Sequence, residues 1–181
     1  MKLLHNSRQI LLAVWVVAST AGGVGPVSAG ELDDGAIIAI YNQVNTFDIE
    51  TAGLGIAKGS SPQVVSLAEM VQRDHTQVRQ MAAELANSLK VARTLPASRA
   101  AATAEHAKVL QRLSGLDGAA FDKAYLEHDI AFHTAAIQAV KEVLIPASQS
   151  DALRDLMTKI LPGFEHHLAE TQKAAKALGY L

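Results

Sequence analysis

Four side chains of the kinds that bind transition metals occupy equivalent places in four separate helical patterns: Asp48, His75, His133 and His167. Around each one, apolar residues recur every three or four positions, which indicates a helix with one face in a core. The pattern is clearest in residues 121–144, where His133 is the polar member of a stripe with Leu126, Ile130, Ile137, Val140 and Leu144. Imidazole and carboxylate groups are common ligands of transition-metal ions.

A single histidine on an apolar face is more often a core residue bonded to a backbone carbonyl than a metal ligand. Four such groups are a different case, because a buried polar group without a partner costs roughly 1–3 kcal/mol. One shared cation satisfies all four groups, and the sequence therefore predicts one transition-metal ion. Imidazole-rich sites suit Zn, Cu, Fe or Ni, and no organic cofactor is indicated. A metal-free polar network is the alternative interpretation.

Two residues near His133 are candidates to support the site. Asp129 precedes His133 by one helical turn and could accept a hydrogen bond that orients the ring. Tyr125 could contribute its hydroxyl group, although a core position is the alternative.

The remaining candidates are expected to lie outside the site. Asp74 points away from the stripe of His75 and is expected to be a solvated charge. His166 is turned by about 100° from His167 and is expected to face solvent. His128 is expected to be structural, and His106 falls on a polar helix.

Four long helices and one shorter helix must position these side chains. The long helices are expected at residues 33–58, 62–91, 117–145 and 150–178, and the shorter one at 98–113. The third long helix is expected to end before Pro146, and Pro162 is expected to kink or divide the fourth. The fold class is therefore all-α, a four-helix bundle in which the short helix is a crossover on the outside.

The depths of the four side chains along the bundle agree only in part. Asp48 lies about 12 residues before the first turn and His75 about 15 after it, so these two can face each other. His133 lies about 13 residues before Pro146, whereas His167 lies about 21 after it. A loop that lasts to about Ser150 and a kink at Pro162 would absorb part of this mismatch.

The first residues have the pattern of a secretory signal peptide. Lys2 and Arg8 precede a short apolar run at 10–18, and Val27-Ser28-Ala29 has the small residues that signal peptidase requires. We therefore expect a signal peptide at 1–29, one domain at 30–181 without a membrane span, and a periplasmic or secreted protein.

Composition narrows the possible partners and the forces that stabilise the fold. Without Lys2 and Arg8, 14 basic residues stand against 18 acidic ones, and no basic block is present, which argues against nucleic acid. The chain has no cysteine, so the exported domain depends on its core, or on its core and a metal. Protein partners stay unknown from the sequence.

Several motifs resemble a known family. The runs FDIETAGLGIAKGSSPQV, MVQRDHTQ, FDKAYLEHDIAFH and LPGFEHHL are similar to the bacterial exported family called domain of unknown function 4142. The resemblance implies a ferritin-like four-helix fold. It also places the family's motif residues on the following positions: Asp48, Asp74, His75, Phe121, Asp122, Tyr125, His133, Leu161, Pro162, His167 and Leu168. The family usually has Glu where this chain has Asp48.

Three functions are compatible with these observations. The leading one is an exported ferritin-like bundle that binds one transition metal, with a role in metal handling or envelope stress. The chain has no Glu-x-x-His motif, which disfavours a di-iron centre and iron storage. The alternatives are a metal-dependent redox enzyme and a metal-free structural or partner-binding module, so the sequence leaves open whether this is an enzyme.

Overall fold

The computed structural model describes residues 32–181, and all the regular structure in this part of the chain is helical. The helices are α1 (Asp34–Lys58), α2 (Pro62–Leu89), η2 (Ala97–Arg99), α3 (Ala100–Ser114), α4 (Gly118–Ala139), η3 (Val140–Leu144), α5 (Ile145–Ala147) and α6 (Asp151–Ala177). The predicted all-α class is confirmed.

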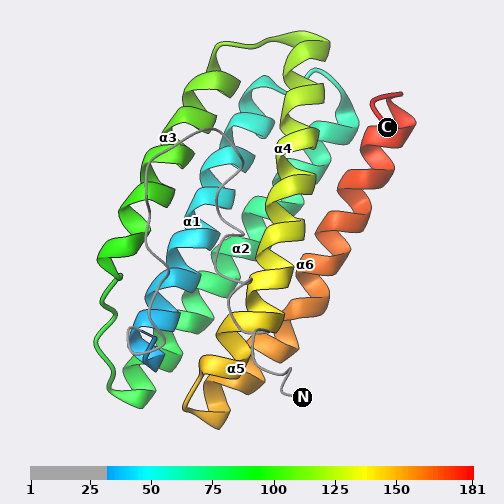
Figure 1. Cartoon of the computed structure of the whole chain (residues 1–181). Helices are drawn as coiled ribbons and strands as arrows, with labels where there is room; N and C mark the ends of the chain where they lie inside the picture. The colour runs from blue at the N-terminus through cyan, green and yellow to red at the C-terminus, as the bar shows by residue number, and fades with distance from the viewer. Residues whose placement is uncertain (1–31) are drawn as a thin grey trace, which may run out of the picture.

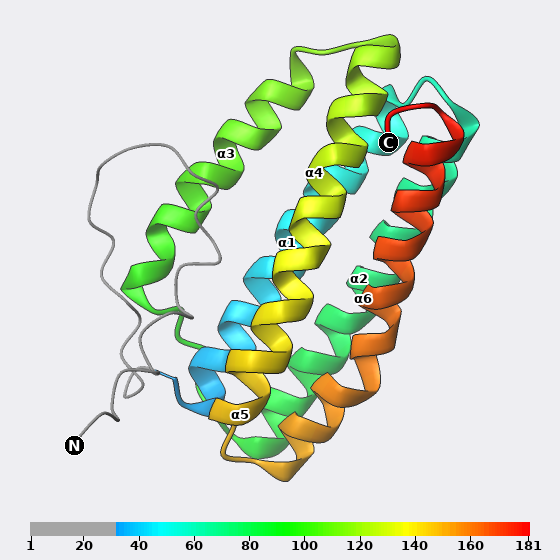
Figure 2. The same ribbon diagram turned by 45° about the vertical axis from the view of Figure 1, so that its right-hand side comes forward.

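The four long helices α1, α2, α4 and α6 lie side by side (Figure 1). They form two antiparallel hairpins, α1 with α2 and α4 with α6, in which short turns join the helices. The connection from α2 to α4 runs back along the molecule through α3, which lies on the outside against α1 (Figure 2). This is the predicted crossover. Each long helix therefore turns one face to a shared interior.

The helix starts follow the capping signals in the sequence. Asp33 caps α1, because its Oδ1 accepts a hydrogen bond from the backbone N–H of Ala36 at 2.7 Å. Ser61 caps α2 in the same way through Val64, and Pro62 takes the first helical position, where no backbone donor is needed.

The expected end of the third long helix before Pro146 and the expected division of the fourth at Pro162 are wrong, whereas a kink at Pro162 stays a prediction. The third long helix does not end before Pro146, because a π turn at Val140–Leu144 leads into α5, which contains Pro146. In a regular α-helix the proline ring would clash with the carbonyl four residues earlier, and the wider turn before it relieves this. Pro162 does not divide α6, which continues to Ala177, and its exposed position leaves the freed carbonyl open to water.

These turns also remove the depth mismatch between His133 and His167. The helical path of the third long helix extends to Ala147, 14 residues after His133, and α6 begins at Asp151, 16 residues before His167. The two histidines are therefore at nearly the same depth.

Each hairpin turn is held by an aspartate from the first helix of the other hairpin. Asp122 of α4 accepts hydrogen bonds at the α1–α2 turn from Ser60 N, Ser60 Oγ and Ser61 N at 2.7–2.9 Å. Asp34 of α1 accepts them at the turn before α6 from Gln149 N and Ser150 N at 2.8 and 2.9 Å. These contacts fix the two hairpins against each other along the bundle.

The core consists of two apolar clusters with a polar layer between them. One cluster contains Ile37, Tyr41, Val78, Met157 and Phe164, and the other contains Val64, Val71, Phe121, Tyr125 and Leu126. Between these stretches of α1, α2, α4 and α6 lie eight buried polar residues: Asn45, Asp48, Thr51, His75, Asp129, His133, His167 and Thr171. The apolar clusters separate this layer from water at both ends.

The predicted signal peptide lies outside the described residues. None of the helices in residues 32–181 is long and apolar enough to cross a membrane.

The Asp122→Ala variant should lower the free energy of unfolding by about 2–3 kcal/mol, because it removes three hydrogen bonds to a buried carboxylate. Asp117→Ala is the matched control, since this side chain is exposed and makes only a surface ion pair with Lys58. Chemical denaturation measures both. Equal stability of the two variants would show that the hydrogen bonds of Asp122 do not stabilise the turn.

Candidate metal centre

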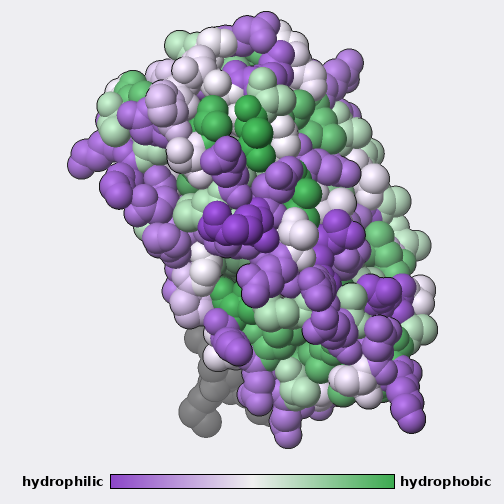
Figure 3. Space-filling view, turned by 180° about the vertical axis from the view of Figure 1, so that it is seen from behind, coloured by the Kyte–Doolittle hydropathy of each residue, from purple (hydrophilic) through white to green (hydrophobic). Residues whose placement is uncertain are grey.

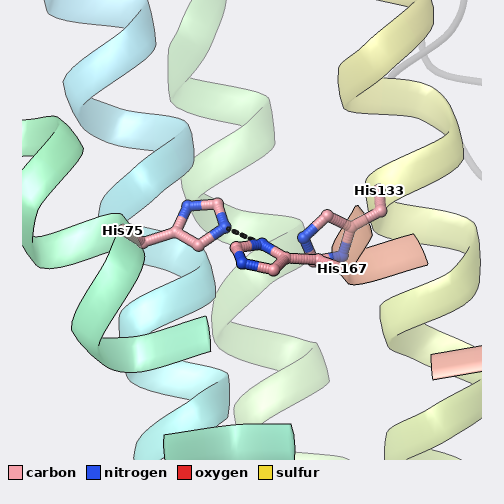
Figure 4. Close-up of side chains that lie close together, drawn as sticks. All are labelled: His75, His133 and His167. Carbon is pink, nitrogen blue, oxygen red and sulfur yellow. Dashed lines mark hydrogen bonds between the residues drawn. The ribbon is translucent and has the colours of Figure 1, made fainter. Parts of the chain in front are cut away.

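The four predicted ligands lie in the polar layer, and each comes from a different helix: Asp48 from α1, His75 from α2, His133 from α4 and His167 from α6. The three histidines form one group that could hold an ion, and Asp48 forms another with Asp129 and His133. All four are 1–2% exposed. Figure 4 shows the three imidazole rings turned toward one another. Their facing atoms are close: Asp48 Oδ2 lies 2.9 Å from His75 Nε2 and 3.3 Å from His133 Nε2, and His75 Nε2 lies 3.2 Å from His167 Nδ1.

The ring of His75 is fixed by an asparagine that the sequence analysis missed. Asn45 Oδ1 lies 2.7 Å from His75 Nδ1, and the amide nitrogen of Asn45 donates to the carbonyl of Tyr41 at 2.7 Å. The amide oxygen therefore faces the ring and accepts the Nδ1 proton. His75 Nε2 consequently presents a lone pair to the centre. The buried stripe of α1 contains Asn45 three residues before Asp48, which is the signal that could have identified it.

The ring of His133 is oriented by Asp129, as expected from their spacing. His133 Nδ1 lies 3.1 Å from the backbone oxygen and 3.3 Å from Oδ2 of Asp129. Thr171 donates its hydroxyl to the same Oδ2 at 2.5 Å, which holds the carboxylate in place. The Nδ1 proton thus points outward, and His133 Nε2 faces the centre.

His167 is oriented in the opposite sense by Asp74. Its Nε2 lies 3.1 Å from Asp74 Oδ2, and its Nδ1 faces the other ligands. Its place off the stripe predicted that Asp74 is a solvated charge, and this prediction needs correction. Although half-exposed, this carboxylate accepts the outward proton of a buried ring.

The three histidines together leave the centre without a proton donor. With its outward nitrogen protonated, each neutral ring offers a lone pair inward, so the 3.2 Å contact between His75 Nε2 and His167 Nδ1, dashed in Figure 4, is a hydrogen bond only if one of the two rings carries its proton on the inner nitrogen. Likewise, Asp48 Oδ2 and His133 Nε2 have no hydrogen-bond partner although both are fully buried. Three lone pairs and a carboxylate oxygen that face one another require a cation between them.

Without a metal ion, the cation that fits this position is a proton on His133. Burial by itself lowers the pKa of His133, but the charges of Asp129 and Asp48 and the bonds to Asp129 outweigh it and raise the pKa to about 10. Burial lowers the pKa of His167, and the charges of His75 and His133 add to this effect. For Asp48, burial raises the pKa, but the surrounding histidines hold it well below its usual range.

Tyr125 is fully buried on α4, and its hydroxyl has no hydrogen-bond partner. Burial raises the pKa of Tyr125, and the charges of Asp129 and Asp48 raise it further, so the hydroxyl stays protonated. The ring of Tyr125 packs in the apolar cluster that contains Val71, Phe121 and Leu126.

The other three histidines of the described residues lie outside the centre. His166 is exposed. His128 is partly buried beside Phe132. His106 is buried, against the expectation for a polar helix, because it stacks on Phe47 and bonds to Glu50 at 2.7 Å. It therefore attaches α3 to α1.

In the metal-free protein at pH 8, His133 should be doubly protonated while His167 is neutral. Nitrogen chemical shifts of ¹⁵N-histidine-labelled protein measure both states. Because the pKa of His133 is raised from 6.5, its contribution to stability is fully present below about pH 6.5 and is lost as the pH rises through about 10. Titration of His133 near pH 6.5 would contradict this description of the centre.

Comparisons with known proteins support the resemblance in the sequence. Comparison with curated proteins and with solved structures gives no match. A family model described as a domain of unknown function, DUF4142, matches residues 20–174, which is well over half of the 181 residues. The chain belongs to the DUF4142 family.

Proposed function

We propose that this protein binds one transition-metal ion through His75 Nε2, His133 Nε2, His167 Nδ1 and an oxygen of Asp48. One observation carries the proposal: four buried acceptor atoms face one another, and every ring proton near them is directed outward to another acceptor. A metal-free polar network would instead need protons between these atoms. The metal-free alternative therefore requires a permanently charged ring in the core, whereas a metal ion satisfies all four atoms.

The spacing of the facing atoms supports this proposal. Metal–nitrogen and metal–oxygen bonds of about 2.0–2.1 Å in a tetrahedral site place the ligand atoms about 3.3 Å apart. Three distances between facing atoms are 2.9, 3.2 and 3.3 Å. These three pairs therefore already have about the spacing of a tetrahedral site.

The ligand set indicates the class of ion. Three imidazoles and one carboxylate suit Zn, Cu, Fe or Ni, whereas Mg and Ca prefer sites made of oxygen atoms. Each helix contributes one ligand, and no helix carries the Glu-x-x-His motif of di-iron bundles. We therefore propose a mononuclear centre in a ferritin-like bundle.

Four ligands from the protein favour holding an ion over catalysis with it. Structural and storage sites are closed by protein ligands, while catalytic sites keep a position open for water or substrate. We propose a role in metal handling, with redox catalysis as the less favoured alternative because it needs a fifth position.

The proposed compartment is the periplasm or the exterior. N-terminal sequencing of the mature protein should begin near Gly30, and retention of Met1 in the membrane would contradict export.

His133→Ala should remove most metal binding, and with it the rise in melting temperature that bound metal gives the parent protein. Titration with Zn²⁺, followed by calorimetry and thermal unfolding, measures both effects. For the parent, the affinity should fall as the pH drops, most steeply below about pH 6, where free imidazoles become protonated.

His166→Ala is the matched control, because it removes an exposed imidazole next to a proposed ligand. It should leave affinity and melting temperature almost unchanged. The four-helix centre is wrong if His133→Ala binds zinc as the parent does, or if His166→Ala is the variant that loses binding.

A further inference from the structure

The three acceptors that orient the histidines differ in their access to water. Asn45 and Asp129 are 0% and 1% exposed, whereas the side chain of Asp74 is 37% exposed. The apolar clusters cover the polar layer at both ends, and α3 covers α1 from outside. Among the described residues that contact the ligands, Asp74 thus provides the polar connection to the surface.

His167 lies between this carboxylate and the centre. One nitrogen of its ring is 3.1 Å from Asp74 Oδ2, and the other is 3.2 Å from His75 Nε2. The ring itself is only 2% exposed. A cation at Asp74 therefore has one imidazole between it and the three other ligands.

Arg73 competes for the same carboxylate. Its Nε donates to Asp74 Oδ1 at 3.0 Å, while its side chain is 67% exposed. Such an exposed pair is weak and exchanges readily with other cations. The guanidinium thus occupies the place that an arriving metal ion would take.

We propose that Asp74 and His167 form the uptake site through which the metal ion reaches the centre, and that Arg73 opposes its arrival. This inference rests on the proposed metal-binding function. The carboxylate attracts the hydrated cation and replaces part of its water. The His167 ring, which keeps its Nε2 proton, then turns to let the ion pass and binds it through Nδ1 together with His75, His133 and Asp48, while the extra proton of His133 is released to water. Release follows the same route in reverse.

The other surface features of the described residues show no second candidate for an interaction site. Among the described residues, the exposed large apolar side chains are Leu95, in the connection between α2 and η2, and Leu181, the last residue. On the face shown in Figure 3, apolar patches are small and separated by hydrophilic side chains. The buried pair of His106 and Glu50 is explained by its contact between α3 and α1.

The test is the rate at which the metal-free full-length protein takes up Co²⁺, followed by stopped-flow absorption. Asp74→Asn should slow uptake at least tenfold, because it keeps an oxygen for the His167 proton but removes the charge that captures the cation. Arg73→Gln should speed uptake and release several-fold. Glu69→Gln and Arg93→Gln are the matched controls, because they make the same charge changes at exposed positions away from the centre.

High salt distinguishes capture of the cation by the Asp74 carboxylate from general electrostatic attraction by the charged protein surface. At 1 M salt the screening length is about 3 Å, so the effects of the two control variants should vanish, while slow uptake by Asp74→Asn should persist. Uptake by Asp74→Asn at the rate of Glu69→Gln would overturn the uptake site and leave metal binding intact. A parent protein that binds no Co²⁺ at equilibrium would instead overturn the proposed function itself, and the uptake site with it.

Discussion

The structure depends on one electrostatic constraint, namely that three imidazole lone pairs and a carboxylate oxygen face one another in a buried layer. Atoms of the same polarity repel at 3 Å, and with their outward nitrogens protonated the neutral rings direct no proton between them. Only a positive charge makes this arrangement favourable. A proton on His133 supplies it in the metal-free protein, and a transition-metal ion would supply it more completely, because an ion bonds to all four atoms.

The rest of the fold serves to keep this layer in register and dry. Asp34 and Asp122 fasten each hairpin turn to the opposite hairpin, so that the four helices cannot slide along one another. Phe164 stacks on His75 with ring centroids 5.0 Å apart and closes the layer on one side. Since each ligand is on a different helix, a shift of any one helix would open the centre.

Periodicity was sufficient to find the four facing residues, because a histidine or aspartate inside an apolar stripe is conspicuous. It also gave the helices and the crossover. It could not give the outer acceptors, since Asn45 is not a metal-ligand type and Asp74 lies off the stripe. Those contacts depend on ring orientation, which sequence spacing does not fix.

Local backbone geometry was the other limit of the sequence interpretation. Proline rules placed the end of the third long helix before Pro146, but a π turn carries the helix past it. That turn also explains why the depths of His133 and His167, which differ when counted from Pro146, agree in the structure. The polar composition of its helix gave no sign that His106 is buried, because its burial comes from stacking on Phe47 of α1.

The most direct test of the central claim is a crystal structure of the zinc-loaded protein with anomalous diffraction at the zinc edge. We expect one ion bonded to His75 Nε2, His133 Nε2, His167 Nδ1 and Asp48, at about 2.0–2.1 Å from each. The use of Nδ1 by His167 and Nε2 by the other two is the specific signature of the outward acceptors. An ion held through His167 Nε2, or an anomalous peak outside the polar layer, would contradict the account.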